Sequence, residues 1–166
     1  MILDDLIAHN EEYAKSYSPL DPLVVPVPRV ALVLCKDGRI DPVAAFGLAA
    51  GEAHVIRNGG GRLADAVRSL AISQTQLGPR EVAIIHHTQC GMMTFHDDEL
   101  RETLRKDLGA DASGVAFLSF TDLEQSVRDD LQLYRSQQLL RQDIPVRGFV
   151  YELETGRLRE VQRRES

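Results

Sequence analysis

Two cysteines and one histidine carry the clearest chemical signal in this chain of 166 residues. Cys35 directly follows an apolar run at 30–34, whereas His87 and Cys90 follow a second apolar run that begins at Val82. Thiolate sulfur and imidazole nitrogen are preferred ligands of Zn²⁺, and three protein ligands leave the fourth tetrahedral position for water or substrate. The pattern therefore predicts a catalytic zinc site made of Cys35, His87 and Cys90.

The same residues allow other interpretations. Asp37 could supply a fourth ligand and make the zinc site structural, since the chain has no third cysteine. Cysteines flanked by apolar residues are also often small buried hydrophobes, and Asp37 with Arg39 could form an ordinary ion pair at a strand end. His86 precedes His87, but strand alternation points the two rings to opposite sides, and the spacing to Cys90 favours His87 as the ligand.

The elements that must position these residues alternate along the chain. Apolar runs predict strands at 30–34, 53–57 and 82–85, and helical periodicity predicts helices over 43–50 and 63–77 between them. This order predicts an α/β fold with a mostly parallel central sheet flanked by helices. Ligands of such sheets gather beyond the carboxyl ends of the strands, where both cysteines and His87 stand.

The rest of the chain extends this core. Helices are predicted over 97–107 and 121–140, and a hairpin of 146–153 with 157–161 would add an antiparallel C-terminal edge strand. Residues 3–16 predict an amphipathic helix, which a proline-rich extended arm follows. Because residues 1–28 are too few for a separate core, we expect one domain over 1–166, with 1–28 as its N-terminal helix and arm.

Composition narrows the function classes. The net charge is −6, so the chain lacks the basic surface that nucleic acids require. No apolar run approaches the roughly 20 residues that a membrane span needs, and the N-terminus does not have the pattern of a secretory signal. With only two cysteines, disulfides are not expected. We therefore expect a cytoplasmic protein with a small-molecule substrate.

Two glycines stand where a backbone could bind an anion. Gly59 lies in a glycine cluster that precedes a predicted helix, and its backbone N–H could contact a substrate anion. The alternative is a sharp turn with close backbone packing. Gly91 directly follows Cys90 and would let the backbone approach the open position of the metal. Both glycines are therefore predicted to bind substrate.

The segment from Val30 to Phe95 resembles the β-class carbonic anhydrases, in particular their short bacterial subgroup, which also includes carbonyl sulfide and carbon disulfide hydrolases. The matching motifs are Cys35-Lys36-Asp37-Gly38-Arg39, Ala53-His54-Val55-Ile56-Arg57-Asn58-Gly59-Gly60, Ser69-Leu70-Ala71-Ile72-Ser73 and His86-His87-Thr88-Gln89-Cys90-Gly91-Met92. The resemblance implies a zinc ion held by Cys35, His87 and Cys90, with Asp37 and Arg39 paired beside it as catalytic residues. It also implies a homodimer that the N-terminal region wraps.

The activity implied by this resemblance is the reversible hydration of CO₂ to bicarbonate by a zinc-bound hydroxide. Hydrolysis of carbonyl sulfide or carbon disulfide is an alternative, because those relatives use the same ligands. A non-catalytic zinc-binding member of the fold is a third interpretation, against which the complete set of motif residues argues. The chain has no tryptophan, so a regulatory bicarbonate pocket built around that residue is not expected.

Overall fold

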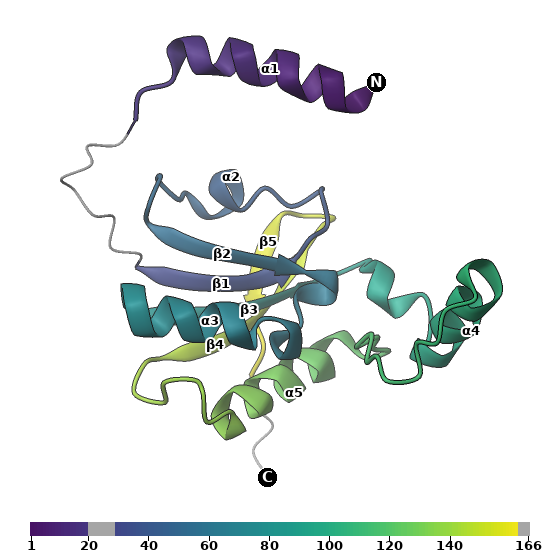
Figure 1. The fold of residues 1–166 in the computed structure, drawn as a ribbon. Helices are drawn as coiled ribbons and strands as arrows, with labels where there is room; N and C mark the ends of the chain where they lie inside the picture. The colour runs from purple at the N-terminus through teal and green to yellow at the C-terminus, as the bar shows by residue number, and fades with distance from the viewer. Residues whose placement is uncertain (20–28, 163–166) are drawn as a thin grey trace.

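The computed structural model describes residues 1–19 and 29–162 (Figure 1). In that part of the chain, one sheet has the strand order β2-β1-β3-β4-β5. The strands are β1 (Val30–Cys35), β2 (Ala53–Asn58), β3 (Glu81–His87), β4 (Val146–Glu152) and β5 (Arg157–Glu160). The first four strands are parallel, and β5 pairs antiparallel with β4. The α/β fold and the antiparallel C-terminal edge are therefore confirmed.

Helices cover both faces of this sheet. In Figure 1, α2 lies on one side of the sheet, and α3 and α5 lie on the other. The helices are α1 (Ile2–Ser16), α2 (Pro42–Phe46), α3 (Val67–Ile72), α4 (Asp97–Leu108) and α5 (Leu123–Ser136). Short 3₁₀ turns lie at Gly59–Gly61, Leu63–Asp65 and Gly91–Met93.

Two predicted helices are shorter than expected. The helix predicted over 43–50 ends at Phe46, because Gly47 adopts a left-handed conformation with φ of 62° and stops it. The Asp41 carboxylate caps its start by accepting hydrogen bonds from the N–H groups of Val43 and Ala44. The helix predicted over 121–140 is α5 alone, which begins after the carboxylate of Asp122 caps the N–H of Gln125.

The prediction of one continuous helix over 63–77 is wrong. That segment contains a 3₁₀ turn, then α3, then a π-helical turn at Ser73–Leu77. The side chain of Gln74 is buried in this wider turn, where its amide donates to the hydroxyl of Tyr134 at 2.7 Å and accepts from the N–H of Arg141 at 2.9 Å. Gly78, with φ of 63°, ends the segment at the position the sequence indicates.

The core lies on both faces of the central strands. On β1, Ala31 and Val33 pack into the cluster beneath α3 and α5, whereas Leu32 and Leu34 pack into the cluster on the α2 side. This alternation follows the two-residue period of a strand. α5 approaches the sheet closely at Gly148 of β4, where a Cβ would clash with side chains of α5. Because β1 pairs directly with β3 in parallel, the carboxyl ends of these two strands lie side by side.

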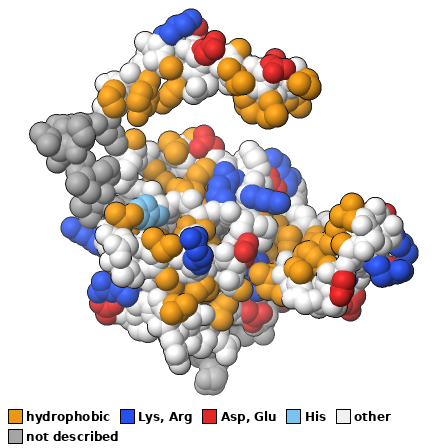
Figure 2. Space-filling view, in the orientation of Figure 1, with side chains coloured by type: hydrophobic (Ala, Val, Ile, Leu, Met, Phe, Trp, Pro, Cys, Tyr) orange, Lys and Arg blue, Asp and Glu red, His pale blue; other side chains and the backbone are white. Residues whose placement is uncertain are grey.

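α1 lies apart from the sheet, and all its residues are exposed (Figure 1). Figure 2 shows hydrophobic side chains gathered along the side of α1 that faces the rest of the molecule. The helix confirms the prediction over 3–16, whereas most of the predicted proline-rich arm, residues 20–28, lies outside the described residues. No helix of the described ranges is long and apolar enough to cross a membrane.

Candidate metal centre and active site

Three donor side chains meet where β1 and β3 end. Cys35 is the last residue of β1, His87 is the last residue of β3, and Cys90 lies in the loop that follows. The two sulfur atoms are 4.0 Å apart, and all three donor atoms lie within 4.8 Å of one another. The side chains are buried, with 5%, 0% and 1% exposure. The structure therefore brings the three predicted ligands together.

The histidine in this group has one ring nitrogen free for a ligand bond. Nδ1 of His87 donates to the carbonyl oxygen of Thr88 at 2.8 Å, because a carbonyl can only accept. This bond leaves the lone pair on Nε2, which is buried and has no hydrogen-bond partner within the described residues. An orphaned buried nitrogen beside two thiols is the arrangement that a thiolate-and-imidazole metal site requires. The donor set therefore fits a divalent metal.

The thiols are strongly coupled. The pKa of Cys35 lies far below its usual value because the Cys90 thiol donates to its sulfur, although burial opposes this shift. The pKa of Cys90 is raised by the same contact and by burial. Burial disfavours the imidazolium of His87, but Cys35, the Thr88 backbone and Asp37 together outweigh burial, so the pKa of His87 is raised. The contact between the two thiols thus favours the thiolate form of Cys35, and a thiolate favours capture of a cation.

Asp37 and Arg39 form a two-pronged ion pair beside this triangle. Nε of Arg39 donates to Oδ1 of Asp37 at 2.9 Å, and Nη2 donates to Oδ2 at 2.7 Å. Oδ2 also lies 3.9 Å from Nε2 of His87, so the carboxylate faces the candidate metal position. Arg39 holds the pKa of Asp37 far below its usual range. Asp37 is therefore ionised and oriented toward the triangle.

The loop that carries Asp37 is anchored by an arginine from the neighbouring strand. Nε of Arg57 donates to the carbonyl of Cys35 at 3.0 Å, and Nη2 donates to the carbonyl of Asp37 at 2.6 Å. The N–H of Lys36 donates to the carbonyl of Asn58. These bonds extend the pairing of β1 with β2 by one loop, which fixes the path from Cys35 to Asp37.

The second histidine of the pair has a different environment. Both ring nitrogens of His86 have partners on α5, namely the hydroxyl of Ser126 at 2.7 Å and the carboxylate of Asp130 at 3.1 Å. The ring also stacks on Phe120, which packs against Cys35 and Cys90. His86 is therefore a packed residue behind the candidate site and lies outside the donor group, where the spacing to Cys90 favoured His87.

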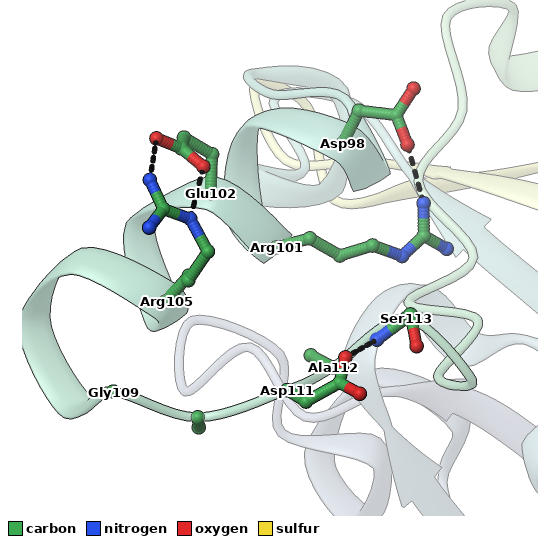
Figure 3. Close-up of a pocket in the computed structure, with 9 residues that line it drawn as sticks. Asp98, Arg101, Glu102, Arg105, Gly109, Asp111, Ala112 and Ser113 are labelled. Atoms are coloured by element: carbon green, nitrogen blue, oxygen red, sulfur yellow. Dashed lines mark hydrogen bonds and ion pairs between the residues drawn. The ribbon is translucent and has the colours of Figure 1, made fainter.

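A pocket elsewhere on the molecule does not contain these residues. Figure 3 shows this pocket of about 370 Å³ between α4 and the turn that follows it. Its two arginines are paired with acids, Arg101 with Asp98 and Arg105 with Glu102. Neither a thiol nor a histidine lines this pocket, and the group of possible metal ligands found among residues 1–19 and 29–162 is Cys35, His87 and Cys90.

Comparison with known proteins agrees with this geometry. The family model described as carbonic anhydrase matches residues 30–158, which include the whole triangle and the Asp37–Arg39 pair. "Beta-carbonic anhydrase 1" of Mycobacterium tuberculosis is 38% identical over 162 residues, covering 96% of this chain and 98% of that protein. The chain belongs to the β-carbonic anhydrase family.

Solved structures of carbonic anhydrases have the same fold. The crystal structure of the carbonic anhydrase from Streptococcus mutans superposes with a TM-score of 0.89 at 44% identity, covering 98% of each chain. "Carbon disulfide hydrolase" of Acidithiobacillus thiooxidans is also similar, at 29% identity over 79% of this chain and 76% of that protein. The relatives of this chain therefore include proteins named as carbonic anhydrases and proteins named as carbon disulfide hydrolases.

The steric need for glycine in this β-carbonic anhydrase fold differs among the glycines near the site. A Cβ on Gly59 would lie in ordinary contact with Met92, and one on Gly91 would meet no atom within 4 Å. Gly61, which was not singled out, has φ of 71°, and a Cβ there would lie 2.8 Å from the carbonyl oxygen of Ile85 and 2.9 Å from the nitrogen of Cys35. Gly61 is therefore the residue of this turn that has no room for a side chain against the strands. Substrate binding at Gly59 and Gly91 stays a prediction.

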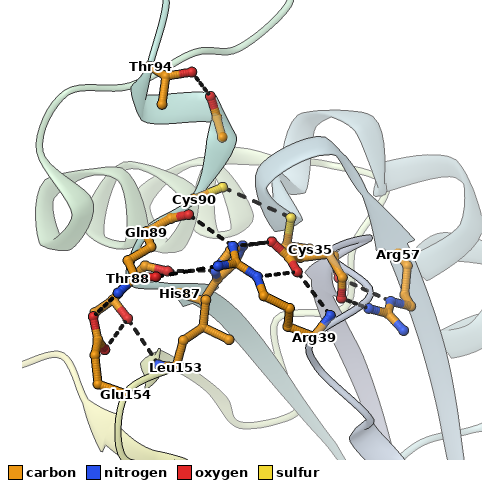
Figure 4. Close-up of polar contacts among 12 residues, drawn as sticks. Cys35, Arg39, Arg57, His87, Thr88, Gln89, Cys90, Thr94, Leu153 and Glu154 are labelled. Carbon is orange, nitrogen blue, oxygen red and sulfur yellow. Dashed lines mark hydrogen bonds and ion pairs between the residues drawn. The ribbon is translucent and has the colours of Figure 1, made fainter.

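Sequence reasoning missed the residues that hold Arg39 from its other side. Nη1 and Nη2 of Arg39 donate to the side-chain and backbone oxygens of Gln89, and the Gln89 amide donates to Glu154 (Figure 4). Gln89 lies within the quoted His86–Met92 motif, but its polar side chain alone gave no signal. Glu154 was recognised only as part of a hairpin turn.

Proposed function

We propose that this chain catalyses the reversible hydration of CO₂ to bicarbonate at a zinc ion held by Cys35, His87 and Cys90. The observation that carries the proposal is the free Nε2 of His87 between two buried thiols, beside a carboxylate that Arg39 holds ionised. Zinc is the metal that a Cys₂His donor set favours, and it supplies hydroxide as a nucleophile near neutral pH. Family membership supports the same reaction.

The protein residues have separate tasks in this proposal. The side chains of Cys35, His87 and Cys90 bind the metal, and the Thr88 carbonyl fixes the tautomer of His87. Oδ2 of Asp37 accepts a hydrogen bond from the attacking oxygen and so turns a lone pair of that oxygen toward the carbon of CO₂. Arg39 holds Asp37 in place, and its charge keeps the acceptor unprotonated.

The walls beside the triangle suit a small apolar substrate. Cys35, Cys90 and Phe120 form a buried cluster against which Met92 and Leu123 pack. Such a surface excludes water from the reacting carbon and strengthens the field of the charged groups. We propose that Gly59 and Gly91 expose backbone at this wall and so contribute to substrate binding.

Metal analysis combined with stopped-flow CO₂ hydration tests this function. We expect about one zinc per chain in the purified protein and a rate well above that of buffer. Asp37→Ala should retain zinc and lose roughly 100-fold in kcat, whereas Cys90→Ser should lose zinc and activity together. Asp107→Ala, which removes an exposed carboxylate on α4, is the control and should retain both. Full activity in a zinc-free protein would contradict the proposal.

Hydrolysis of carbon disulfide or carbonyl sulfide is the second candidate, favoured by the similarity to "Carbon disulfide hydrolase" of Acidithiobacillus thiooxidans. Both molecules are linear like CO₂, and water would replace their sulfur as H₂S. Initial rates for CO₂ and for release of H₂S, measured on one preparation, distinguish the two functions. We propose CO₂ as the substrate because the more similar relative is a β-carbonic anhydrase.

We further propose that the chain works as a homodimer in the cytoplasm. The apolar side chains of α1 are exposed, as are Val55, Ile72 and Leu77 beside a groove of about 370 Å³ along β2 and α3. A second copy would bury both surfaces. The two thiols serve as metal ligands only when they are reduced, which a cytoplasmic location favours.

A further inference from the structure

Arg39, whose position determines that of Asp37, is not held by burial. Its side chain is 53% exposed, whereas the Asp37 carboxylate that it orients is only 17% exposed. An exposed arginine samples several rotamers unless hydrogen bonds fix it. Its bonds to Asp37 use Nε and Nη2, which leaves Nη1 and the second hydrogen of Nη2 for another anchor.

Gln89 is that anchor. Its side-chain Oε1 accepts from Nη1 of Arg39 at 3.3 Å, and its carbonyl oxygen accepts from Nη2 at 3.1 Å. The backbone of Gln89 is left-handed, with φ of 55°, which is unusual for a residue other than glycine. The surrounding contacts must therefore hold this residue in place.

Glu154, on the turn between β4 and β5, supplies those contacts. Its Oε1 accepts from Nε2 of Gln89 at 2.8 Å, and its Oε2 accepts from the hydroxyl of Thr88 at 2.7 Å (Figure 4). The Thr88 hydroxyl in turn accepts from the N–H of Leu153 at 3.0 Å. One carboxylate thus holds two consecutive residues of the loop between His87 and Cys90.

The directions of these bonds leave a single arrangement. Arg39 can only donate and an ionised Glu154 can only accept, so the amide of Gln89 must direct Oε1 to the arginine and Nε2 to the glutamate. The amide is therefore fixed from both ends, as a relay between a positive and a negative group. Removal of the negative end releases the amide and, with it, one side of Arg39.

We propose that Glu154 is a positioning residue for the reaction, which acts through Gln89 and Arg39 to hold the carboxylate of Asp37 toward the metal ligands. Glu154 does not contact the ligands or the reacting atoms in this role. This inference rests on the proposed function, because a position of Asp37 has a catalytic consequence only if the chain is an enzyme.

A polarity exchange tests the relay. In Glu154→Gln, the new amide accepts from only one of its two present donors, so we expect kcat to fall roughly 10-fold, with KM and zinc content unchanged. Gln89→Glu alone places two carboxylates side by side and should lower kcat at least as much. In the double variant with both changes, every donor again has an acceptor, so most of the wild-type kcat should be recovered.

A matched control lies on the same hairpin. Glu160 pairs with Arg147 at 2.8 Å, away from the loop of Gln89, so Glu160→Gln should leave kcat unchanged. A second readout does not depend on activity, namely solvent exchange of the Arg39 Nε–H in nitrogen-15 NMR spectra of the protein as purified. Glu154→Ala should speed this exchange roughly 10-fold, since Arg39 then has one anchor fewer.

The outcomes separate the relay from the function. Wild-type kcat and wild-type exchange in Glu154→Ala would overturn the relay, as would a double variant no faster than Glu154→Gln. A wild-type protein that hydrates no CO₂, while Glu154→Ala still speeds the exchange of Arg39, would overturn the proposed function and uphold the positioning of Arg39 by Glu154.

Discussion

Two adjacent histidines show how partners decide what a residue does. His86 and His87 differ by one position, yet both ring nitrogens of His86 are bonded to α5, while His87 keeps Nε2 free beside the thiols. The strand period separates the two rings, and the partners assign their roles. Spacing to Cys90 singled out His87, whose ring the structure places beside both thiols, but the partners of His86 lie 40 and 44 residues later and could not be read locally.

Asp130 is the centre of the buried network behind the site. Its carboxylate accepts from Nε and Nη2 of Arg62, from the N–H of Leu63 and from His86. Burial raises the pKa of Asp130, but the hydrogen bonds from His86 and Arg62 outweigh it, so the pKa in the folded state is lowered. The ionised form therefore stabilises the fold.

This lowered pKa predicts a pH dependence of stability. The contribution of Asp130 is complete above the unfolded-state pKa of about 3.9 and is lost as pH falls through the lower folded-state pKa. Asp130→Asn leaves Arg62 without its charge partner and should cost about 3 kcal/mol at pH 7. As pH falls below about 4, the wild type should lose stability more steeply and approach the variant.

Urea unfolding at a series of pH values from 6 down to the acid limit measures this convergence. Asp107→Asn, on the exposed face of α4, is the control and should follow the wild-type curve. Parallel curves for the wild type and Asp130→Asn would show that folding does not lower the pKa of Asp130, and would contradict this prediction.

At the scale of elements, the sequence predicted the strands, because their evidence is the apolar pattern and the order of the elements along the chain. Continuous apolar runs gave the parallel strands, and placing Cys35 and His87 at two strand ends was enough to predict that they meet. The irregular segments were not predictable, because buried side chains override local helical preference. Gln74, for example, widens a helical turn while bonding to Tyr134, which is 60 residues away.

The same limit applies to the site. The candidate metal ligands and the Asp37–Arg39 ion pair lie within short motifs, so residue type and spacing were sufficient to predict that these side chains gather. Gln89 and Glu154 are 65 positions apart, and their bond depends on a left-handed loop meeting a hairpin turn. The hairpin turn was predicted from the sequence, but the left-handed backbone of Gln89 has no signature in residue type, so the bond between the two residues was not predictable.

The 3₁₀ turn at Gly59–Gly61 packs against the backbone at the carboxyl ends of β1 and β3. Because a Cβ at Gly61 would overlap the backbone of both β1 and β3, Gly61→Ala must push the strands apart or distort the turn. Together with its positive φ, this predicts a loss of about 3 kcal/mol in the free energy of unfolding. Urea denaturation is the measurement. Gly114→Ala, at a position with open space, should change stability by less than about 0.5 kcal/mol, and an equal effect of both substitutions would refute the packing argument.

At the scale of the whole molecule, α1 is the feature that a single chain does not explain. Leu3, Leu6 and Ile7 are exposed on one stripe of the helix, as are Tyr13 and Tyr17. An isolated amphipathic helix of 15 residues is marginal in water. Its stability must therefore come from a surface that covers this stripe, and a second copy offers an apolar groove along β2 and α3.

A charge on either side of α1 tests whether a second copy covers it. Leu6→Asp places a carboxylate in the stripe, removes an apolar contact of about 2 kcal/mol and buries a charge, so the dimer dissociation constant should rise at least 100-fold. Ala8→Asp adds the same charge on the opposite side of the helix and should leave association unchanged. Sedimentation velocity over a range of concentrations measures both constants. If Leu6→Asp sediments as a dimer like the wild type, the stripe is not the interface, and the two copies must associate through another surface.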